Sequence, residues 1–344
     1  MTGTREPLVS ICVPAYNAEK TLRDTLDSIV GQSYRNIRVV VSDNASSDST
    51  PEMVAEYAKA DPRVTISRLA FNIGGEGNFS ECIRLGEGEY TAIYHSDDVY
   101  DPEMVRRSVE ALENAPEAAA VFVMASGIDE RGREVRRYRF PDDIRPDPDG
   151  LYRFPALLKA VLKYGNFFFC PGVMVRTRVY KETVGTWDVG RYKTSSDLHV
   201  WFRIFEKFPV AVIDEPLLHY RLATASYSYN LARSRTWRPD IFLLLDDYVS
   251  NPRGVALSGS DLMNYRLQEL LDNIRRAFNF LLQGERGQGL RMLSGLFNPA
   301  VAAFAMKSAY HLKVMLFGWT VLFLHFIPLP GLVKEKLFKL RYGG

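Results

Sequence analysis

Two adjacent carboxylates at the end of an apolar run are the residues of this chain whose placement most suggests chemistry. Asp97 and Asp98 end the apolar segment that begins at Ala92, just after a turn sequence rich in Gly and Glu. Such a run predicts a buried strand, and a buried strand cannot hold unpaired carboxylates, so the pair is expected at its exit. Open α/β folds bind ligands at this sheet edge, where two carboxylates suit Mg²⁺ or Mn²⁺ on a diphosphate. The alternative is a strand end that only leads into the helix beginning near Pro102.

Two polar loops follow the first two predicted strands and are expected at the same sheet edge. The first is Pro14-Ala15-Tyr16-Asn17 and the second runs from Ser42 to Asp48. Asp43 can accept a hydrogen bond from a nucleobase N–H, and Tyr16 can pack against the base. Because Asn, Asp and Ser are also common in plain turns, a simple helix cap is the alternative for the second loop.

A glycine-rich stretch, residues 72–78, precedes the carboxylate pair in the sequence. It lacks the Gly-x-Gly-x-x-Gly spacing of a dinucleotide site, and the Lys-Ser/Thr of a phosphate-binding loop does not follow it. We therefore expect a tight turn that leads into a helix.

The overall composition disfavours several classes of protein. The chain has 344 residues and a net charge of only +2, which gives no global attraction to nucleic acid. Its 3 cysteines are far apart and belong to no Cys-x-x-Cys or His cluster, which disfavours a disulfide framework or a zinc site and fits a reducing compartment. The polar N-terminus, residues 1–7, lacks the apolar core of a secretory signal.

Residues 1–125 alternate between strand and helix patterns. The predicted strands are 8–13, 36–41, 63–67, 90–94 and 118–124, and the predicted helices between them are 22–30, 51–60, 75–85 and 102–112. This alternation predicts an α/β, Rossmann-like fold with a mostly parallel central sheet and helices on both faces.

The rest of the chain has a different pattern. Residues 126–235 predict an α+β half of the same domain, with a hairpin at 128–140, an aromatic strand at 166–175, a helix at 197–208 and a short strand at 211–213. Residues 236–344 show no clear strand pattern and predict a helical, apolar C-terminal extension, with one helix at 265–282.

Taken together, the motifs resemble those of one family. The chain contains, in this order, Pro14-Ala15-Tyr16-Asn17, Asp43-Asn44-Ala45-Ser46-Ser47-Asp48, Asn72-x-Gly74, Gly88-Glu89-Tyr90 and Ser96-Asp97-Asp98. This ordered set is similar to the nucleotide-sugar domain of family 2 glycosyltransferases, which have the GT-A fold. The resemblance covers about residues 8–112 closely and continues more loosely to about residue 221.

The resemblance implies roles for particular residues. The positions that match the family's nucleotide-sugar site are Pro14, Tyr16, Asn17, Asp43, Asn72, Asp97 and Arg221. Asp97 and Asp98 match the site of the divalent metal, Mg²⁺ or Mn²⁺, and Asp197 matches the single carboxylate base of this mostly inverting family. Displacement at an anomeric carbon needs a base near the acceptor hydroxyl, and a metal offsets the charge of the leaving diphosphate. The alternative for Asp197 is an ordinary helix N-cap.

The chain departs from the family pattern in three places. His95 stands where many members have the first Asp of an Asp-x-Asp motif, and residues 78–80 are Asn-Phe-Ser where Ala-Arg-Asn is frequent. Residues 218–223 resemble a Tyr-Arg-x-His segment that packs on the diphosphate, but Ala223 replaces the His. Arg221 is retained and is still expected to contact the diphosphate.

The C-terminal region contains an uncharged run that is long enough to cross a bilayer. Residues 314–333 contain no Asp, Glu, Lys or Arg, and basic residues flank them on both sides. Basic flanks favour the cytoplasm for both ends, and Pro328 and Pro330 interrupt a helix before it would complete a span. We therefore predict that about residues 300–333 associate with the cytoplasmic leaflet, aided by anionic lipid. The alternative is a helix packed on the protein's own core.

Together these features predict a metal-dependent, inverting glycosyltransferase at the cytoplasmic face of a membrane. Residues 1–125 would bind a UDP- or dTDP-type sugar, and residues 126–235 a hydroxyl of a glycan or polyprenyl-linked acceptor, in cell-surface polysaccharide synthesis. One alternative is a sugar nucleotidyltransferase, but residues 13–20 lack the glycine- and basic-rich loop usual in that class. A non-catalytic sugar-binding protein of the same fold is the other alternative.

Overall fold

The chain forms two compact units. The computed structural model describes residues 6–187, 190–222, 234–328, 331 and 335–337. The first unit comprises Met1–Leu157 and Asn166–Leu222, and the second comprises Leu158–Gly165 and Ala223–Gly344. The predicted halves 1–125 and 126–235 therefore share the first unit up to residue 222, except for Leu158–Gly165, which belong to the second unit.

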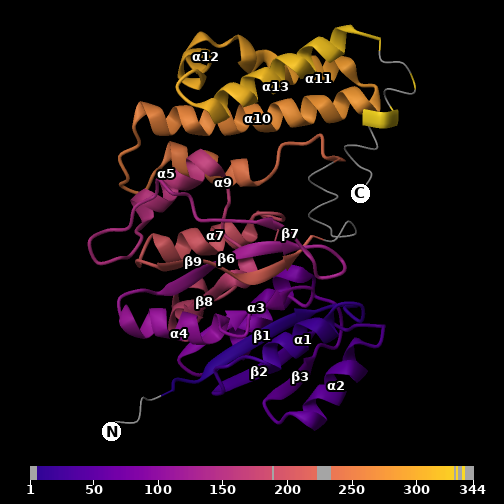
Figure 1. The fold of residues 1–344 in the computed structure, drawn as a ribbon, viewed down its shortest axis with the longest axis vertical. Helices are drawn as coiled ribbons and strands as arrows, with labels where there is room; N and C mark the ends of the chain where they lie inside the picture. The colour runs from indigo at the N-terminus through magenta and orange to yellow at the C-terminus, as the bar shows by residue number, and fades with distance from the viewer. Residues whose placement is uncertain (1–5, 188–189, 223–233, 329–330, 332–334, 338–344) are drawn as a thin grey trace. The chain divides into compact units, whose positions relative to one another are not determined.

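A single large sheet forms the centre of the first unit (Figure 1). Its strands are β1 (Val9–Ala15), β2 (Ile37–Asp43), β3 (Val64–Arg68), β4 (Tyr90–Ile93), β5 (Val99–Tyr100), β6 (Ala120–Ile128), β7 (Glu134–Arg137), β8 (Val173–Arg176) and β9 (Ala211–Arg221). They are ordered β3-β2-β1-β4-β8-β6-β9-β5, and β7 pairs with β6. The buried runs of β1, β2 and β4 are the residues whose apolar pattern predicts strands.

The sheet is parallel on one side and mixed on the other. β3, β2, β1 and β4 are parallel, as the alternating pattern predicts. β8 runs antiparallel to β4 and β6, and β5 runs antiparallel to β9, but β6 and β9 are parallel, so the expectation of a mostly parallel sheet holds for the first four strands and for the β6–β9 pair. β8 is antiparallel to β6 because the chain, after β7 and α5 (Phe154–Tyr164), enters β8 from the end of the sheet at which β6 ends.

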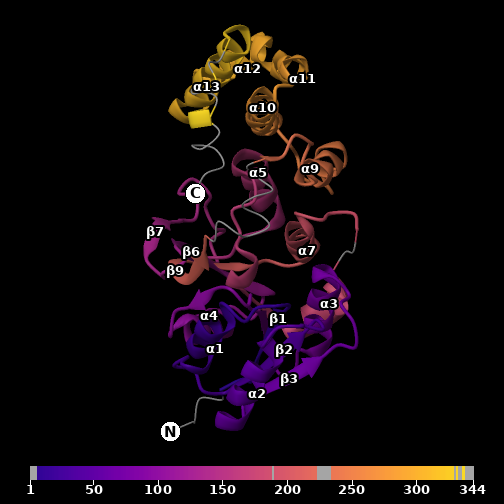
Figure 2. The same cartoon turned by 90° about the vertical axis from the view of Figure 1, so that its right-hand side faces the viewer.

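Helices cover both faces of this sheet (Figure 2). The helices α1 (Leu22–Val30), α2 (Thr50–Ala60) and α4 (Met104–Asn114) lie on one face, and α3 (Gly75–Leu85) and α7 (Ser196–Phe205) lie on the other. The apolar positions of the first three helices pack on the strands in one core, which includes Leu22, Leu26, Ile29, Val54, Val105 and Leu112. The helical periodicity of the sequence is therefore satisfied by burial against the sheet.

Two predicted strands differ from the structure. Residues 166–169 are irregular and Cys170–Gly172 form a 3₁₀ turn, so only Val173–Arg176 of the expected 166–175 strand is extended. The expected short strand at 211–213 is instead the long β9, which continues to Arg221 because bulges opposite Val123 and Met124 absorb its break in apolar pattern.

The second unit is helical in its described residues. Its helices after residue 222 are α9 (Ile241–Ser250), α10 (Gly259–Gln283), α11 (Arg286–Met292), α12 (Pro299–Ala305) and α13 (Ala309–Phe326). α10 begins with a capping box between Ser258 and Asp261 and ends at Gly284 in the left-handed conformation. α10, α12 and α13 share a separate apolar core that includes Leu267, Leu270, Ile274, Val301, Val314 and Val321.

Candidate active site

The loops that follow β1, β2, β3 and β4 line an open pocket of about 500 Å³. It is lined by Pro14, Ala15, Tyr16, Asn17, Ala18, Thr21, Asn44, Asn72, Gly74, Gly75, Asn78, Phe79, His95, Ser96 and Asp97. Because β1 lies between β2 and β4, parallel strand ends bring these loops to one edge. The structure thus brings together the predicted residues Pro14, Tyr16, Asn17, Asn72 and Asp97.

Hydrogen bonds join the loops after β1 and β2. The Asn17 backbone N–H donates to Ser46 Oγ at 2.9 Å, and the Ser47 N–H donates to Asn17 Oδ1 at 2.9 Å. Asn17 and Ala45 both have positive φ, at 49° and 60°, a backbone conformation that is uncommon outside glycine. The side chain of Tyr16 is 51% exposed, so its ring is available to a ligand at the pocket rim.

Asp43 lies beneath the second loop and is fully buried. Its Oδ1 accepts a hydrogen bond from the Ser46 N–H at 3.2 Å, and its Oδ2 lies 3.2 Å from Arg68 Nε. It is not among the residues that line the pocket. Its contact with a nucleobase therefore stays a prediction from the family resemblance.

The glycine-rich stretch forms the tight turn that its sequence predicts. Asn44 Nδ2 donates to Asn72 Oδ1 at 3.1 Å and to the Gly74 carbonyl at 3.0 Å, and Gly74 has a φ of 81°. Gly74 and Gly75 also line the pocket at the beginning of α3, a contribution that the motif comparison missed. The strand order could have predicted this contribution, because the loop after β3 lies at the same sheet edge as the loop after β1.

The turn after β4 carries a group of three potential metal ligands. Ligand atoms of His95, Asp97 and Asp98 lie within 4.8 Å of one another. Asp98 Oδ2 and His95 Nε2 are buried and have no hydrogen-bond partner, which is the state expected of atoms that await a cation. Carboxylate oxygen and imidazole nitrogen together suit Mn²⁺ well, so the residues present fit the expected metal. His95 is thus a further candidate ligand, beyond the predicted pair.

Burial and like charge dominate the electrostatics of this turn. Burial, and then the neighbouring Asp97 carboxylate, raise the pKa of Asp98 well above its ordinary value, although Arg221 opposes this. Burial lowers the pKa of His95, and the Asp97 carboxylate opposes that shift. A divalent cation beside both carboxylates would offset their repulsion.

Helix α1 and Arg221 hold the turn in place. Thr21 Oγ1 donates to the Ser96 carbonyl at 2.9 Å, and Thr25 Oγ1 donates to the Asp98 carbonyl at 2.7 Å. The Arg221 backbone N–H donates to Asp98 Oδ1 at 2.8 Å, while its Nε donates to the Asp97 carbonyl at 2.8 Å. The turn is thereby fixed by both its backbone and one carboxylate.

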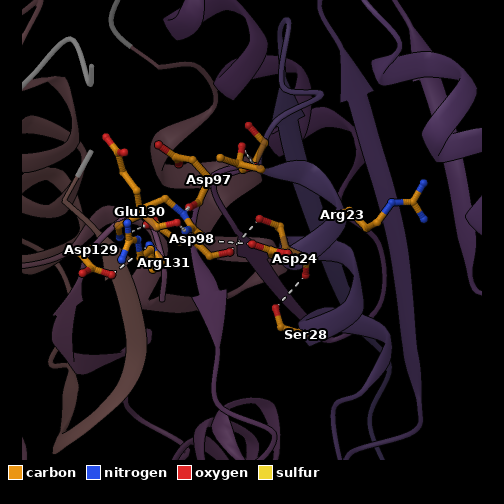
Figure 3. A network of polar contacts seen from close by, with 12 residues as sticks. Arg23, Asp24, Ser28, Asp97, Asp98, Asp129, Glu130 and Arg131 are labelled. Carbon is orange, nitrogen blue, oxygen red and sulfur yellow. Dashed lines mark hydrogen bonds and ion pairs between the residues drawn. The ribbon is translucent and has the colours of Figure 1, made fainter. Parts of the chain in front are cut away.

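The guanidinium of Arg221 is directed into the protein. Its Nη2 donates to Asp24 Oδ2 at 3.1 Å and its Nη1 to the Glu130 carbonyl at 3.4 Å, and the side chain is only 6% exposed. Figure 3 shows Asp24, Asp97 and Glu130 gathered around this network. Arg221 does not line the pocket. The diphosphate contact that the family resemblance implies for Arg221 therefore stays a prediction. Ala223, which replaces the family's His, lies outside the described residues.

Asp197 lies in the first turn of α7 and is partly exposed. The N-cap of this helix is Ser195, so Asp197 is not the cap residue that the alternative interpretation assumed. Its Oδ2 accepts a hydrogen bond from Asn166 Nδ2 at 3.2 Å, and its Oδ1 lies 2.7 Å from the Leu198 backbone nitrogen. It does not line the pocket.

The carboxylate of Asp197 and those of the Asp97–Asp98 pair affect the pKa values of two partly buried residues, Cys170 and Tyr220. Burial raises the pKa of Cys170, and the carboxylates of Asp197 and Asp98 raise it further. Burial also raises the pKa of Tyr220, with further contributions that include the carboxylates of Asp98, Asp97 and Asp197. The candidate base and the candidate metal site therefore belong to one region of the first unit.

Solved structures share this fold. Residues 1–349 of TarS from S. aureus in complex with UDP-GlcNAc align with a TM-score of 0.56 and 18% identity, covering 92% of this chain and 90% of that one. The mannosyltransferase PcManGT from Pyrobaculum calidifontis, in complex with GDP-Man and Mn²⁺, aligns with a TM-score of 0.52 and 18% identity, covering 94% and 86%. The mixed sheet and its edge pocket therefore define a GT-A glycosyltransferase fold.

Sequence comparisons identify the family. The model described as Glycosyl transferase family 2 matches residues 10–184. The chain is 26% identical over 235 residues to the Bacillus subtilis protein named putative teichuronic acid biosynthesis glycosyltransferase TuaG, covering 67% of this chain and 86% of that protein. It is 27% identical over 202 residues to the putative glycosyltransferase EpsE of the same organism, covering 58% and 68%. Because the family match spans just over half of the sequence, the chain belongs to glycosyl transferase family 2.

Proposed function

We propose that this protein is a metal-dependent, inverting glycosyltransferase that takes its sugar from a UDP- or dTDP-type donor. The observation that carries the proposal is the turn after β4, where ligand atoms of His95, Asp97 and Asp98 lie within 4.8 Å of one another and His95 and Asp97 line the pocket. A simple sugar-binding protein needs neither metal ligands nor a base, and residues 13–20 lack the glycine- and basic-rich loop usual in nucleotidyltransferases. Two structural neighbours support this donor class, since TarS was solved in complex with UDP-GlcNAc and PcManGT in complex with GDP-Man and Mn²⁺.

The donor binds in the pocket, with its base against Tyr16 and its diphosphate at Asp97, and the family resemblance implies a contact between the base and Asp43. Asn17 and Asn72 present amide groups to the ribose and phosphate region, and Pro14 forms the floor beside them. A divalent ion held by His95, Asp97 and Asp98 would supply positive charge to the leaving diphosphate. Arg221 acts as a positioning residue that fixes the backbone of this turn.

Asp197 is the general base of this proposal. Its carboxylate accepts the proton of the acceptor hydroxyl as the hydroxyl oxygen attacks the anomeric carbon from the side opposite the diphosphate. The C–O bond to the diphosphate breaks in the same displacement, which inverts the anomeric configuration. The Asn166 amide, 3.2 Å from Asp197 Oδ2, orients the carboxylate without supplying a proton that would neutralise it.

The acceptor is a hydroxyl of a glycan or of a polyprenyl-linked sugar at the cytoplasmic face of a membrane, in the synthesis of a surface polysaccharide. The relative TuaG, which is named as a putative teichuronic acid biosynthesis glycosyltransferase, supports this class of acceptor. The apolar helix α13 supports the membrane location, because Ala309–Phe326 is long and apolar enough to cross a membrane by length and composition.

The experiment that tests the base is the substitution Asp197→Asn. It removes the proton acceptor at nearly constant shape, so transfer should fall by about 10²–10⁴-fold while donor affinity barely changes. Release of the nucleotide product from a panel of nucleotide sugars, with Mn²⁺ and a polyprenyl-linked acceptor, measures transfer. Asp142→Asn, an exposed aspartate of the same unit, is the matched control. Unchanged transfer by the Asp197→Asn protein would rule out this assignment.

A further inference from the structure

Helix α13 presents two different apolar faces. One face, which includes Val314, Met315 and Val321, is buried against α10, α12 and the turn at Leu293–Phe297 (Figure 1). The opposite face exposes a stripe of large apolar side chains with helical spacing: Leu312, Leu316, Trp319, Phe323 and Phe326. Three of these side chains are more than half exposed: Leu316 at 58%, Phe323 at 64% and Phe326 at 69%. We call these five residues the α13 stripe.

The buried face of α13 is fixed closely to its neighbours. Gly318 allows this approach, because a Cβ there would lie 2.5 Å from Leu296 Cδ2 and 2.8 Å from Ile274 Cδ1. At the C-terminal end, Arg286 donates to the carbonyls of His325 and Ile327, both at 2.9 Å, and so satisfies groups that a helix end leaves unpaired. α13 is therefore a part of the helical unit, and only its outer face lacks a partner in the described residues.

The chain segment that contains the α13 stripe has basic residues and no acidic ones. Residues 286–334 contain no Asp or Glu, and the exposed Lys307 and Lys313 lie just before and within α13. Aromatic residues gather beside the stripe, where Tyr310 is 57% exposed and Phe297 packs edge-on against Trp319 with ring centroids 5.3 Å apart. Aromatic and basic side chains around an apolar surface are the combination that suits a membrane interface with anionic lipid.

We propose that α13 lies flat in the interface of an anionic membrane, with the α13 stripe in the lipid and the opposite face kept on α10 and α12. This inference rests on the proposed membrane location and specifies how the protein attaches to the membrane. A flat helix buries the stripe without breaking the contacts of Gly318 and Arg286, whereas a spanning helix would have to leave them. Thus α13 attaches the unit to one leaflet.

Vesicle flotation of the full-length protein tests this proposal. The probe is phosphatidylcholine vesicles with and without about one third phosphatidylglycerol, at about 0.1 M and about 0.5 M NaCl. The double substitution Trp319→Glu with Phe323→Glu places carboxylates on the stripe at exposed positions, where the fold tolerates them. The matched control is Trp237→Glu with Leu243→Glu, which changes an equally exposed Trp and Leu elsewhere in the second unit.

The proposal predicts that the native protein and the control float with anionic vesicles, and that the stripe variant floats at least about tenfold less. High salt should weaken flotation only in part, because the apolar contribution is not screened. Equal flotation of the stripe variant would overturn the α13 proposal, whereas nucleotide release by the same samples reports separately on the proposed transferase. The native protein could instead fail to float and form a dimer that the stripe substitutions disrupt. That result would assign the α13 stripe to contact with a second copy of the chain and would also overturn the membrane proposal.

Discussion

At the scale of single residues, His95 matters more than the motif comparison suggested. It stands where relatives often have an aspartate, and in the structure its Nδ1 lies 3.8 Å from Asp98 Oδ2, in a group whose ligand atoms lie within 4.8 Å of one another. An imidazole nitrogen can replace a carboxylate oxygen as a ligand of Mn²⁺, so the chain keeps a three-ligand group despite its departure from the family pattern.

Substitution of His95 tests this role directly. His95→Ala should weaken Mn²⁺ binding by roughly tenfold or more, because a ligand is lost, whereas His95→Asp should keep it near the native value. Titration of free Mn²⁺ by electron paramagnetic resonance measures the affinity without reference to activity. Equal affinities in all three proteins would show that His95 is no ligand.

Arg221 is the second residue whose role emerges only in three dimensions. Its guanidinium bonds to the Asp97 carbonyl, the Glu130 carbonyl and Asp24, contacts that need a planar, multiply donating group. Arg221→Lys should keep the charge but lose most of these bonds, lowering the free energy of unfolding by about 1–3 kcal/mol and also weakening Mn²⁺ binding.

Urea unfolding monitored by circular dichroism provides the measurement for Arg221. Arg131→Lys, in the exposed part of the neighbouring hairpin, is the matched control and should leave stability within about 0.5 kcal/mol. If both substitutions lower the free energy of unfolding equally, the buried network contributes no special stability.

At the scale of elements, the parallel half of the sheet could be predicted because β1, β2 and β4 are continuous apolar runs separated by amphipathic helices. The mixed half could not, because strand direction there depends on where the chain re-enters the sheet. The aromatic run at 166–169 has the composition of a strand but no neighbouring strand to pair with. Strand β9 was underestimated because Asp214, Glu215 and Pro216 interrupt its apolar pattern.

The same distinction applies to the site. The loops after β1, β2 and β4 could be placed together from the sequence because parallel strand ends share one edge. The inward direction of Arg221 could not, since it depends on the approach of α1 and the β6–β7 hairpin. The position of Asp197 beyond the pocket lining likewise follows from tertiary packing.

Gly88, just before β4, offers a test of how an element is positioned. It has a φ of 75°, and a Cβ there would lie 2.5 Å from the Leu8 backbone carbonyl oxygen. Gly88→Ala should therefore lower the free energy of unfolding by about 2–4 kcal/mol, through backbone strain and a clash that backbone movement must relieve.

Gly132 is a matched control for Gly88. It has a similar φ of 76° but open space around its Cβ position, so Gly132→Ala should cost only about 1 kcal/mol. Thermal and urea unfolding of the two variants separate strain from the clash. A Gly132→Ala protein as unstable as Gly88→Ala would show that strain alone determines both effects.

At the scale of the whole molecule, the chain consists of two units with separate apolar cores. A ligand that binds the first unit should stabilise that unit alone, because ligand binding raises the stability of the structure that holds the site. Calorimetry should therefore show two unfolding transitions, and UDP with Mn²⁺ at about 100 times the dissociation constant should raise one by about 5–11 °C. An equal rise in the temperatures of both transitions would indicate that the two units unfold together.

The central claim is that the pocket beside His95, Asp97 and Asp98 binds a nucleotide sugar through a divalent metal. Isothermal titration of UDP- and dTDP-sugars into the full-length protein, with Mn²⁺ and then with excess EDTA, tests it most directly. The account predicts binding with Mn²⁺, weakened at least about tenfold by EDTA and equally weakened in an Asp98→Asn protein. Binding that is as tight in EDTA as in Mn²⁺, or no binding of any of these sugars in either condition, would contradict it.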